Sequence, residues 1–290
     1  MASFDNKKQL RFIITLGTGK FGTSSNNVIT IQGLRARISI DKAGGMQMGQ
    51  LKARIFGVSQ SDMNAITVLQ WGPRSLIPNT VEVYAIDGAV ETLVFAGNIV
   101  NAWGDYQSIP DVCLQIEAQA AYFQQIKPVP PRSFKGAVDV VSVMAQIARS
   151  MGYSLENNGV TAQLRDVYLH NTDMAQAREL AQMAGVDLYV DDKIMAICPH
   201  LAPRNSLIPL ISASTGMIGY PTFDGVGINT RILFNPSVTF GGKIKIESDI
   251  PRANGEWVVS SVSHTLDCET PNGEWSSQIR GSLSGLVVTK

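Results

Sequence analysis

The first third of the chain alternates apolar and polar positions with a period of two. This pattern predicts strands, because successive side chains of a strand point to opposite faces. A linker over residues 41–49 with Gly44-Gly45 at its centre predicts that two of these strands fold back as a hairpin. The apolar sets are Leu10, Phe12, Ile14 and Leu16, then Leu34, Ala36, Ile38 and Ile40, then Leu51, Ala53 and Ile55.

The alternation resumes after a short helix, which we expect Ser61 to cap and Trp71–Pro73 to end. Further strands are predicted at Val81–Ile86, Leu93–Trp103 and Val112–Ala118. Residues 1–132 are therefore predicted to form an antiparallel β domain.

Three prolines within Lys127–Arg132 mark a domain boundary, since proline cannot donate to a strand ladder. Beyond it the apolar period becomes helical, with one helix ending at Gly152 and a second running from Thr172-Asp173 to Gly185. The strands Val186–Val190 and Ile194–Ile197 follow as a hairpin. Residues 133–203 are thus predicted to form a small α/β domain.

The chain returns to strands after a linker from Pro199 to Pro209, and turn residues separate them. Residues 204–290 are predicted to form a second β domain, with strands at Ile228–Phe234, Lys243–Glu247, Trp257–Leu266 and Trp275–Arg280. The expected fold class is mainly β (α+β), with the α/β domain inserted between two antiparallel β domains.

The two β regions resemble each other as an internal repeat. Val81–Ile86, Phe95–Trp103 and Cys113–Glu117 have the same order and similar lengths as Lys243–Glu247, Val258–Leu266 and Ser276–Arg280. The likeness lies in the pattern rather than in identical residues.

Composition narrows the functional class. The 290 residues are 44% hydrophobic and 17% charged, which excludes a disordered chain, and mean hydropathy of +0.06 suggests apolar surface that partners cover. The 24 basic and 24 acidic residues cancel, so no overall field attracts nucleic acid. We find neither a signal sequence nor a membrane segment, and we expect assembly in the cytoplasm.

Gly17–Gly22 matches the dinucleotide fingerprint G-x-G-x-x-G. The fingerprint requires a helix at its last glycine, but the strand pattern Val28–Ile31 comes next, so a hairpin loop is the better interpretation. It is not a phosphate-binding P-loop either, because Phe21 stands where a serine or threonine must reach Mg²⁺.

No other motif predicts catalysis or metal binding. The histidines are His170, His200 and His264, and the cysteines are Cys113, Cys198 and Cys268. Their spacing contains no tight ligand pair for zinc, and the odd number of distant cysteines favours buried thiols over disulfides. His264 and Asp267 could join a serine triad, but no G-x-S-x-G elbow supplies the nucleophile. We therefore expect no catalytic, cofactor-binding or metal-binding residues and no cofactor.

One predicted hairpin face is basic, since Arg35, Arg37, Lys52 and Arg54 lie opposite its apolar positions. Like charges on one face repel unless water or a partner's acids compensate them. A solvated face, a subunit contact and a channel wall remain alternatives.

Three blocks follow one another in the C-terminal β region: Thr215–Phe223, Gly227–Pro236 and Phe240–Gly242. In this order they resemble phage baseplate hub proteins. The segments from Phe95 to Ile116 and from Gly255 to Trp275 look like the tube-type strands of that family.

The resemblance implies a structural, non-enzymatic subunit of the virion tail baseplate. It implies two tail-tube-like β-barrel or sandwich domains per chain, so that a homotrimer presents six units. Such a trimer joins the tail tube, or its initiator, to the central spike, with tape-measure and wedge proteins as further partners and a lumen that passes DNA. The alternatives are an adaptor of a related contractile injection system and a tail-associated peptidoglycan hydrolase.

Overall fold

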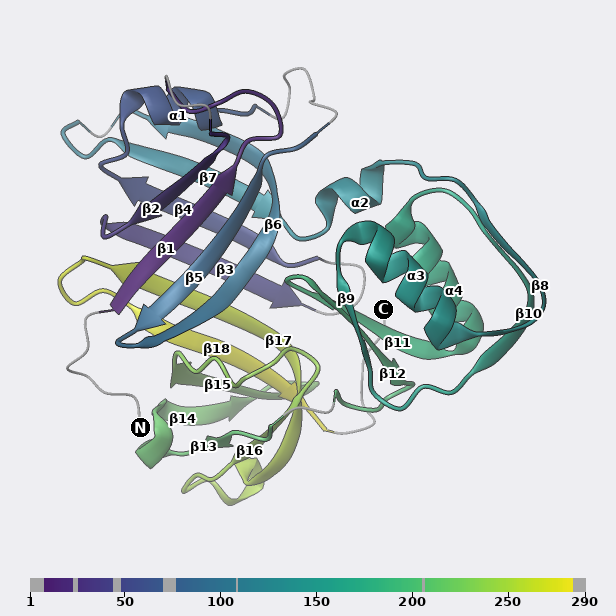
Figure 1. The fold of residues 1–290 in the computed structure, drawn as a ribbon. Helices are drawn as coiled ribbons and strands as arrows, with labels where there is room; N and C mark the ends of the chain where they lie inside the picture. The colour runs from purple at the N-terminus through teal and green to yellow at the C-terminus, as the bar shows by residue number, and fades with distance from the viewer. Residues whose placement is uncertain are drawn as a thin grey trace.

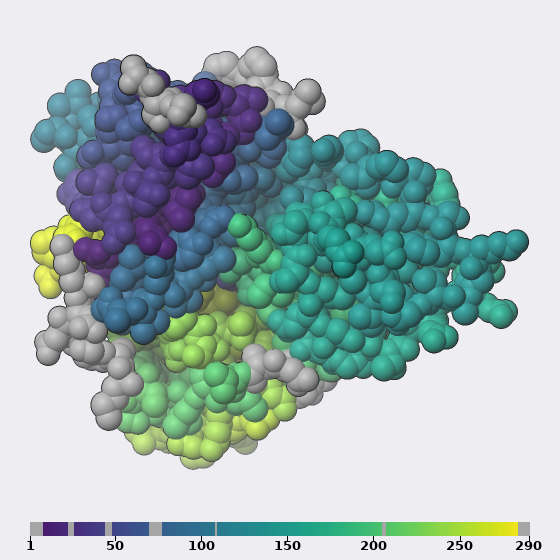
Figure 2. All heavy atoms as spheres, viewed as in Figure 1, coloured from purple at the N-terminus to yellow at the C-terminus, as the bar shows by residue number. Residues whose placement is uncertain are grey.

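The computed structural model describes residues 8–22, 26–43, 48–69, 77–107, 109–204 and 207–283. Two β regions lie next to each other, and an α/β region stands to one side of them (Figure 1). The space-filling view shows the α/β region as a lobe that projects from the β regions (Figure 2). The mainly β class with antiparallel sheets is therefore confirmed.

The N-terminal β region follows the predicted alternation. Its strands hydrogen-bond in the order β3-β4-β7-β6-β5-β1-β2. Every second side chain enters one apolar core, in which Phe12, Ile38 and Ile55 are buried. The strands are β1 (Lys8–Thr15), β2 (Val28–Gln32), β3 (Ala36–Ala43), β4 (Gln50–Phe56), β5 (Thr80–Asp87), β6 (Val90–Asp105) and β7 (Cys113–Gln119).

The predicted hairpin forms, since Asp41 of β3 lies opposite Gln50 of β4. Its Gly44-Gly45 turn is outside the described residues, as is the predicted helix end at Trp71–Pro73. The expected cap of helix α1 (Gln60–Ile66) is wrong. Ser59 accepts from the Asp62 amide at 3.1 Å, so the helix begins before Ser61.

The α/β region contains the two predicted helices with the predicted ends. Thr172 caps α4, and Gly152 and Gly185 end α3 and α4 with φ of 76° and 62°. The predicted hairpin is β11-β12, and the sequence pattern missed β8, β9 and β10. The elements are α2 (Tyr122–Ile126), β8 (Arg132–Asp139), α3 (Val140–Met151), β9 (Ser154–Asn157), β10 (Gln163–Leu169), α4 (Asp173–Ala184), β11 (Val186–Asp191) and β12 (Ile194–Pro199).

The C-terminal β region has the four predicted strands and two more, β13 and β14. It packs its own apolar core, with Ile228, Ile244 and Val262 buried. The elements are β13 (Leu210–Ile211), β14 (Met217–Phe223), β15 (Gly227–Leu233), β16 (Lys243–Ile246), β17 (Gly255–Cys268) and β18 (Trp275–Ser282), with 3-10 turns at Ala213–Thr215 and Pro251–Ala253.

Candidate interface: a duplicated sheet and its polar face

The internal repeat is a repeat of strand order and register. The consecutive strands β5, β6 and β7 pair antiparallel, and so do β16, β17 and β18. The pairing of β6 with β7 has a register shift between Ile99 and Asn101, and the pairing of β17 with β18 has the same shift between Val259 and Ser261. The shift between Val83 and Tyr84 in the β5-β6 pairing has no counterpart in the β16-β17 pairing. The hairpins β3-β4 and β14-β15 then occupy matching places beside β7 and β18.

The two copies are joined edge to edge within the chain. The second half of β17 pairs antiparallel with β3, from Ser261 opposite Ala43 to Cys268 opposite Ala36. The described strands of both regions therefore share one sheet, which includes the order β14-β15-β18-β17-β3-β4-β7-β6. Leu266, although in the C-terminal region, packs in the N-terminal core.

The shared sheet has one apolar and one polar face at this junction. Ile38, Ile40 and Leu266 are buried on the apolar face. On the opposite face Ser263 donates to Asp41 at 2.6 Å across the junction. Because successive residues of a strand alternate, each strand presents polar residues to this second face.

The basic residues of the hairpin lie on this polar side, and two of them are paired with acids of the same chain. Arg37 donates to both oxygens of Asp267 at 2.9 and 2.7 Å, and this hydrogen bond raises the pKa of Arg37. Arg35 donates to Asp111 at 2.7 Å. Together with Arg54, the two arginines line a hollow that Asp111, Asp105 of β6 and Cys113 of β7 also line. The basic face is thus partly neutralised from within the chain.

A buried ionic cluster connects the α/β region to the N-terminal β region. Lys42 of β3 donates to Asp191 at 2.6 Å and to Asp192 at 2.8 Å. Burial alone would lower the pKa of Lys42, but the two carboxylates outweigh it and raise that pKa. Asp192 also accepts from the Ala96 amide of β6 at 3.1 Å. The cluster holds the β11-β12 turn against the sheet.

Arg204 extends this cluster toward the C-terminal region. It donates to both carboxylate oxygens of Glu156 at 3.0 and 2.8 Å, and to the carbonyl of Phe240 at 3.0 Å. Burial would lower the pKa of Arg204, but Glu156 and Asp191 raise it. Sequence reasoning missed the whole cluster, because its members are scattered along the chain.

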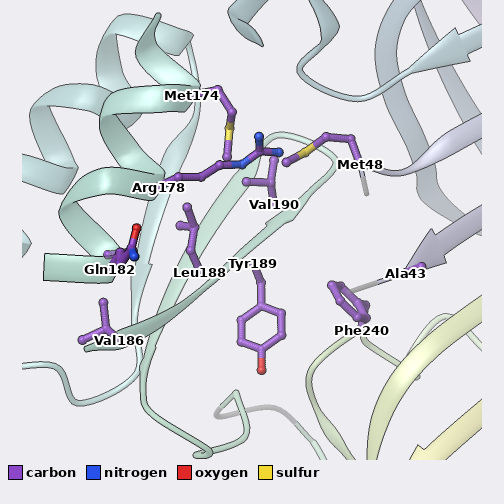
Figure 3. A pocket seen from close by; sticks show the side chains of 11 residues that line it. Ala43, Met48, Met174, Arg178, Gln182, Val186, Leu188, Tyr189, Val190 and Phe240 are labelled. Atoms are coloured by element: carbon purple, nitrogen blue, oxygen red, sulfur yellow. The ribbon is translucent and has the colours of Figure 1, made fainter. Parts of the chain in front are cut away.

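A hollow of about 340 Å³ lies between the α/β region, Ala43 and Met48 of the N-terminal β region, and Phe240 of the C-terminal β region. Figure 3 shows Met48, Met174 and Leu188 around it, with Tyr189 near Phe240. The last two rings meet edge to face with centroids 5.3 Å apart. Most of the residues that line this hollow are apolar.

The residues considered for catalysis engage separate partners. His264 contacts Ser277 at 2.7 Å, whereas Asp267 accepts from Arg37. Burial, followed by the nearby Lys42, lowers the pKa of His264 to about 3, so the ring is neutral at physiological pH. A neutral, enclosed imidazole without the carboxylate does not make the serine triad that the sequence could suggest.

The other two histidines and the three cysteines do not form a common site. His200 contacts Asp187 at 3.1 Å, and the ring of His170 stacks on Tyr168. The three cysteines are buried free thiols. Over the described ranges, no group of three or more histidine, cysteine or acidic side chains could hold a metal.

The G-x-G-x-x-G stretch follows β1, and the next described element is the antiparallel strand β2. The Leu16 amide donates to Asn27 at 2.8 Å across this turn. Gly17 is required sterically, since a Cβ there would lie 2.0 Å from the Ile77 carbonyl oxygen. The glycines thus serve a hairpin between strands rather than the opening of a helix.

The fold is that of phage tail proteins. The chain is similar to a tail protein from Neisseria meningitidis MC58, with a TM-score of 0.65 and 10% identity over 96% of this chain and 97% of that one. It is similar to the 43 kDa tail protein of prophage MuSo2 from Shewanella oneidensis, with a TM-score of 0.62 and 9% identity over 93% and 96%.

A third similar structure is an E. coli component of the type VI secretion system, itself described as similar to the T4 tail proteins gp27 and gp5. Its TM-score is 0.54, with 6% identity over 86% of this chain and 73% of that one. No curated protein matches the sequence. The family model described as baseplate hub gp41 matches residues 11–270, and the chain belongs to that family.

Family membership confirms the resemblance found in the sequence and defines a structural component of the tail baseplate. In the part of the chain that the structure describes, every helix is too short or too polar to cross a membrane.

Proposed function

We propose that the chain forms a homotrimer whose two β regions per chain make a pseudo-six-fold ring. The observation that carries the proposal is the duplication of one strand order and register, with the two copies already joined edge to edge by β17 and β3. Three such chains supply six similar units, which match a six-fold tube on one side and a three-fold spike on the other. Closure into a ring also satisfies the exposed strand edges.

The domain boundaries that we propose are 1–132 and 204–290 for the two tail-tube-like β domains, with 133–203 as the α/β domain. The three apolar cores support this division, since each is centred on one of these ranges. The ionic cluster around Lys42 connects the α/β domain to the first β domain. In this arrangement that domain is available for contacts at the periphery.

We propose that the polar face of the shared sheet lines a channel for the ejected genome. Three of its arginines are paired along the sheet with acids: Arg37 with Asp267, Arg231 with Glu274, and Arg280 with Asp224. Neutralised cations release few counterions from DNA, so they do not hold it strongly. A wall of this kind lets DNA slide past. The basic face of the hairpin is then part of a channel wall.

The partners in this proposal follow from the position of the ring. The tail tube or its initiator binds one rim and the spike binds the other, with tape-measure and wedge proteins as further contacts. The chain acts without catalysis or cofactors, and it assembles in the host cytoplasm before joining the virion.

The mass of the purified protein tests the trimer. Native mass spectrometry should give three times the 31.3 kDa of one chain. A six-copy ring would instead favour a tube adaptor of a related injection system. A chain that stays monomeric and is absent from tail particles would refute the hub proposal. Zymography on cell-wall substrate distinguishes the structural role from the enzymatic alternative, since clear lysis would indicate a peptidoglycan hydrolase.

A further inference from the structure

We infer that β14 of one chain adds to the open edge of β6 in the next chain, as β3 adds to β17 within one chain. This inference rests on the proposed trimer and names the strands that close it. Among the described residues, β14 is a terminal strand of the shared sheet. β5 pairs with β6 as far as Asn98, the Ile99 amide still donates to the Asn79 carbonyl, and Val68 bridges Ala102. Within the described ranges, no strand pairs with residues 103–105 on that side of β6.

The register of the new junction can be read from the junction that already exists. Counting from the common register shift, Gly104 of β6 corresponds to His264 of β17. Counting along the neighbouring strands, Phe223 of β14 corresponds to Ile40 of β3. Since His264 lies opposite Ile40, the inference places Gly104 opposite Phe223 of the next chain.

The adjacent pair follows from the same template. Asp105 corresponds to Thr265, and Thr222 corresponds to Ser39, which lies opposite Thr265. Asp105 should therefore lie opposite Thr222 of the next chain. Like their counterparts, both side chains belong to the polar face of the sheet.

Exposed apolar side chains lie at both strands of the inferred β6-β14 junction. Ile40 and Leu266, buried within the existing junction, are each 0% exposed. Their counterparts Phe223 and Tyr106 are 49% and 42% exposed. Large apolar side chains at the same places in the repeat are thus covered in one copy and bare in the other. A second strand-to-strand junction would cover them.

Gly104 and Tyr106 together offer Phe223 an aromatic surface. The Tyr106 ring of the same chain fills the place of the missing Gly104 side chain, 2.8 Å from the position of a Cβ. Tyr106 is 42% exposed, so Phe223 of the next chain would pack against this ring.

Two features limit the junction to a short stretch. Val68 pairs with Ala102, at the place where Lys42 pairs with Val262 in the template, so strand addition begins at Trp103. On the other strand, the register between Ile218 and Thr222 is irregular. A single short junction binds weakly, so we expect the closed ring of three to be far more stable than an open dimer.

The other terminal strand, β2, is the competing edge. It follows β1 at the far end of the sheet, and no strand in the repeat shows how β14 would pair with it. The proposal therefore commits to β6, and β2 serves as the control in the test.

Disulfide trapping tests the register. Asp105→Cys and Thr222→Cys are combined in one chain with Cys113→Ala, because Cys113 lies opposite Asp105 on β7 and would otherwise compete. Opposed Cβ atoms of paired strands are close enough for a disulfide with small adjustments. After mild oxidation we expect covalent dimers and trimers on a non-reducing gel, which a reductant reverses. The control chain carries Gln32→Cys of β2 in place of Asp105→Cys.

A second measurement avoids engineered cysteines. Phe223→Ser should raise the concentration at which the trimer dissociates at least ten-fold, whereas Tyr220→Ser, on the same strand but inside the irregular stretch, should change it less than three-fold. Both side chains are largely exposed in one chain, so neither change disturbs its core. Circular dichroism checks that both variants fold.

The outcomes separate this inference from the trimer itself. A trimer whose engineered cysteines stay unlinked, or one that links through Gln32→Cys instead, would overturn the β6-β14 junction and leave the trimer standing. A chain that is monomeric at all concentrations would overturn both.

Discussion

Lys42 should be the most sensitive charged residue of the chain. Its side chain is 11% exposed and holds two carboxylates at 2.6 and 2.8 Å. Lys42→Met keeps the apolar stem but leaves Asp191 and Asp192 buried together without their shared cation. Removing one partner of a buried ion pair costs about 3–5 kcal/mol, so we expect a loss in the free energy of unfolding of that order.

The assay is unfolding in urea followed by tryptophan fluorescence. The matched control is Lys245→Met, which removes an ion pair with Glu247 whose two side chains are each 52% exposed. Solvent and salt screen such an exposed pair, so this variant should unfold close to the unchanged protein. Adding Asp192→Asn to Lys42→Met should restore part of the loss, because one uncompensated charge is removed.

Equal, small losses for Lys42→Met and Lys245→Met would refute this reasoning. A double variant less stable than Lys42→Met alone would also contradict it, since the argument attributes the cost to the carboxylates left without a cation.

Three further predictions concern local features. Burial lowers the pKa of His264 from 6.5 to about 3, so the unfolded chain binds the extra proton; stability is complete above pH 6.5 and falls by up to about 1.4 kcal/mol per unit as pH drops toward 5. His264→Gln should flatten that slope in urea titrations, and an unchanged slope would contradict the assignment. Ser59→Ala should cost about 1 kcal/mol and Ser61→Ala less than about 0.5 kcal/mol in thermal unfolding; equal costs would restore Ser61 as the cap. Burial raises the pKa of Cys198 to about 11, so a thiol reagent should label it at pH 8 only after unfolding, and rapid labelling of the folded chain would disprove its burial.

The functional class was largely readable from the sequence, but the interface was not. The ordered blocks carried the hub resemblance, and the repeat of three strands was visible as a pattern. The pairing of β17 with β3 was not, because it joins residues more than 200 positions apart. Nothing in a strand's own pattern specifies which distant edge it will meet. Strand β14 was missed as well, since Gly219 and Pro221 interrupt its alternation.

The basic face shows the same limit. The sequence placed Arg35 and Arg37 on one face of a hairpin, and an unmatched cationic surface was one consequence. In the structure Asp111, which lies just before β7, accepts from Arg35, and Asp267 of β17 accepts from Arg37. Only the folded chain shows how far such charges are neutralised.

The sequence by itself determined what depends on neighbouring residues. The two long helices end at Gly152 and Gly185 as predicted, because a left-handed residue after a helix is a local requirement that glycine meets. Strand alternation is local in the same sense. Tertiary structure alone decided the edge-to-edge junction of the two copies and the burial of Lys42 between Asp191 and Asp192, because both bring together segments whose separation in the chain leaves no periodic or spacing signal.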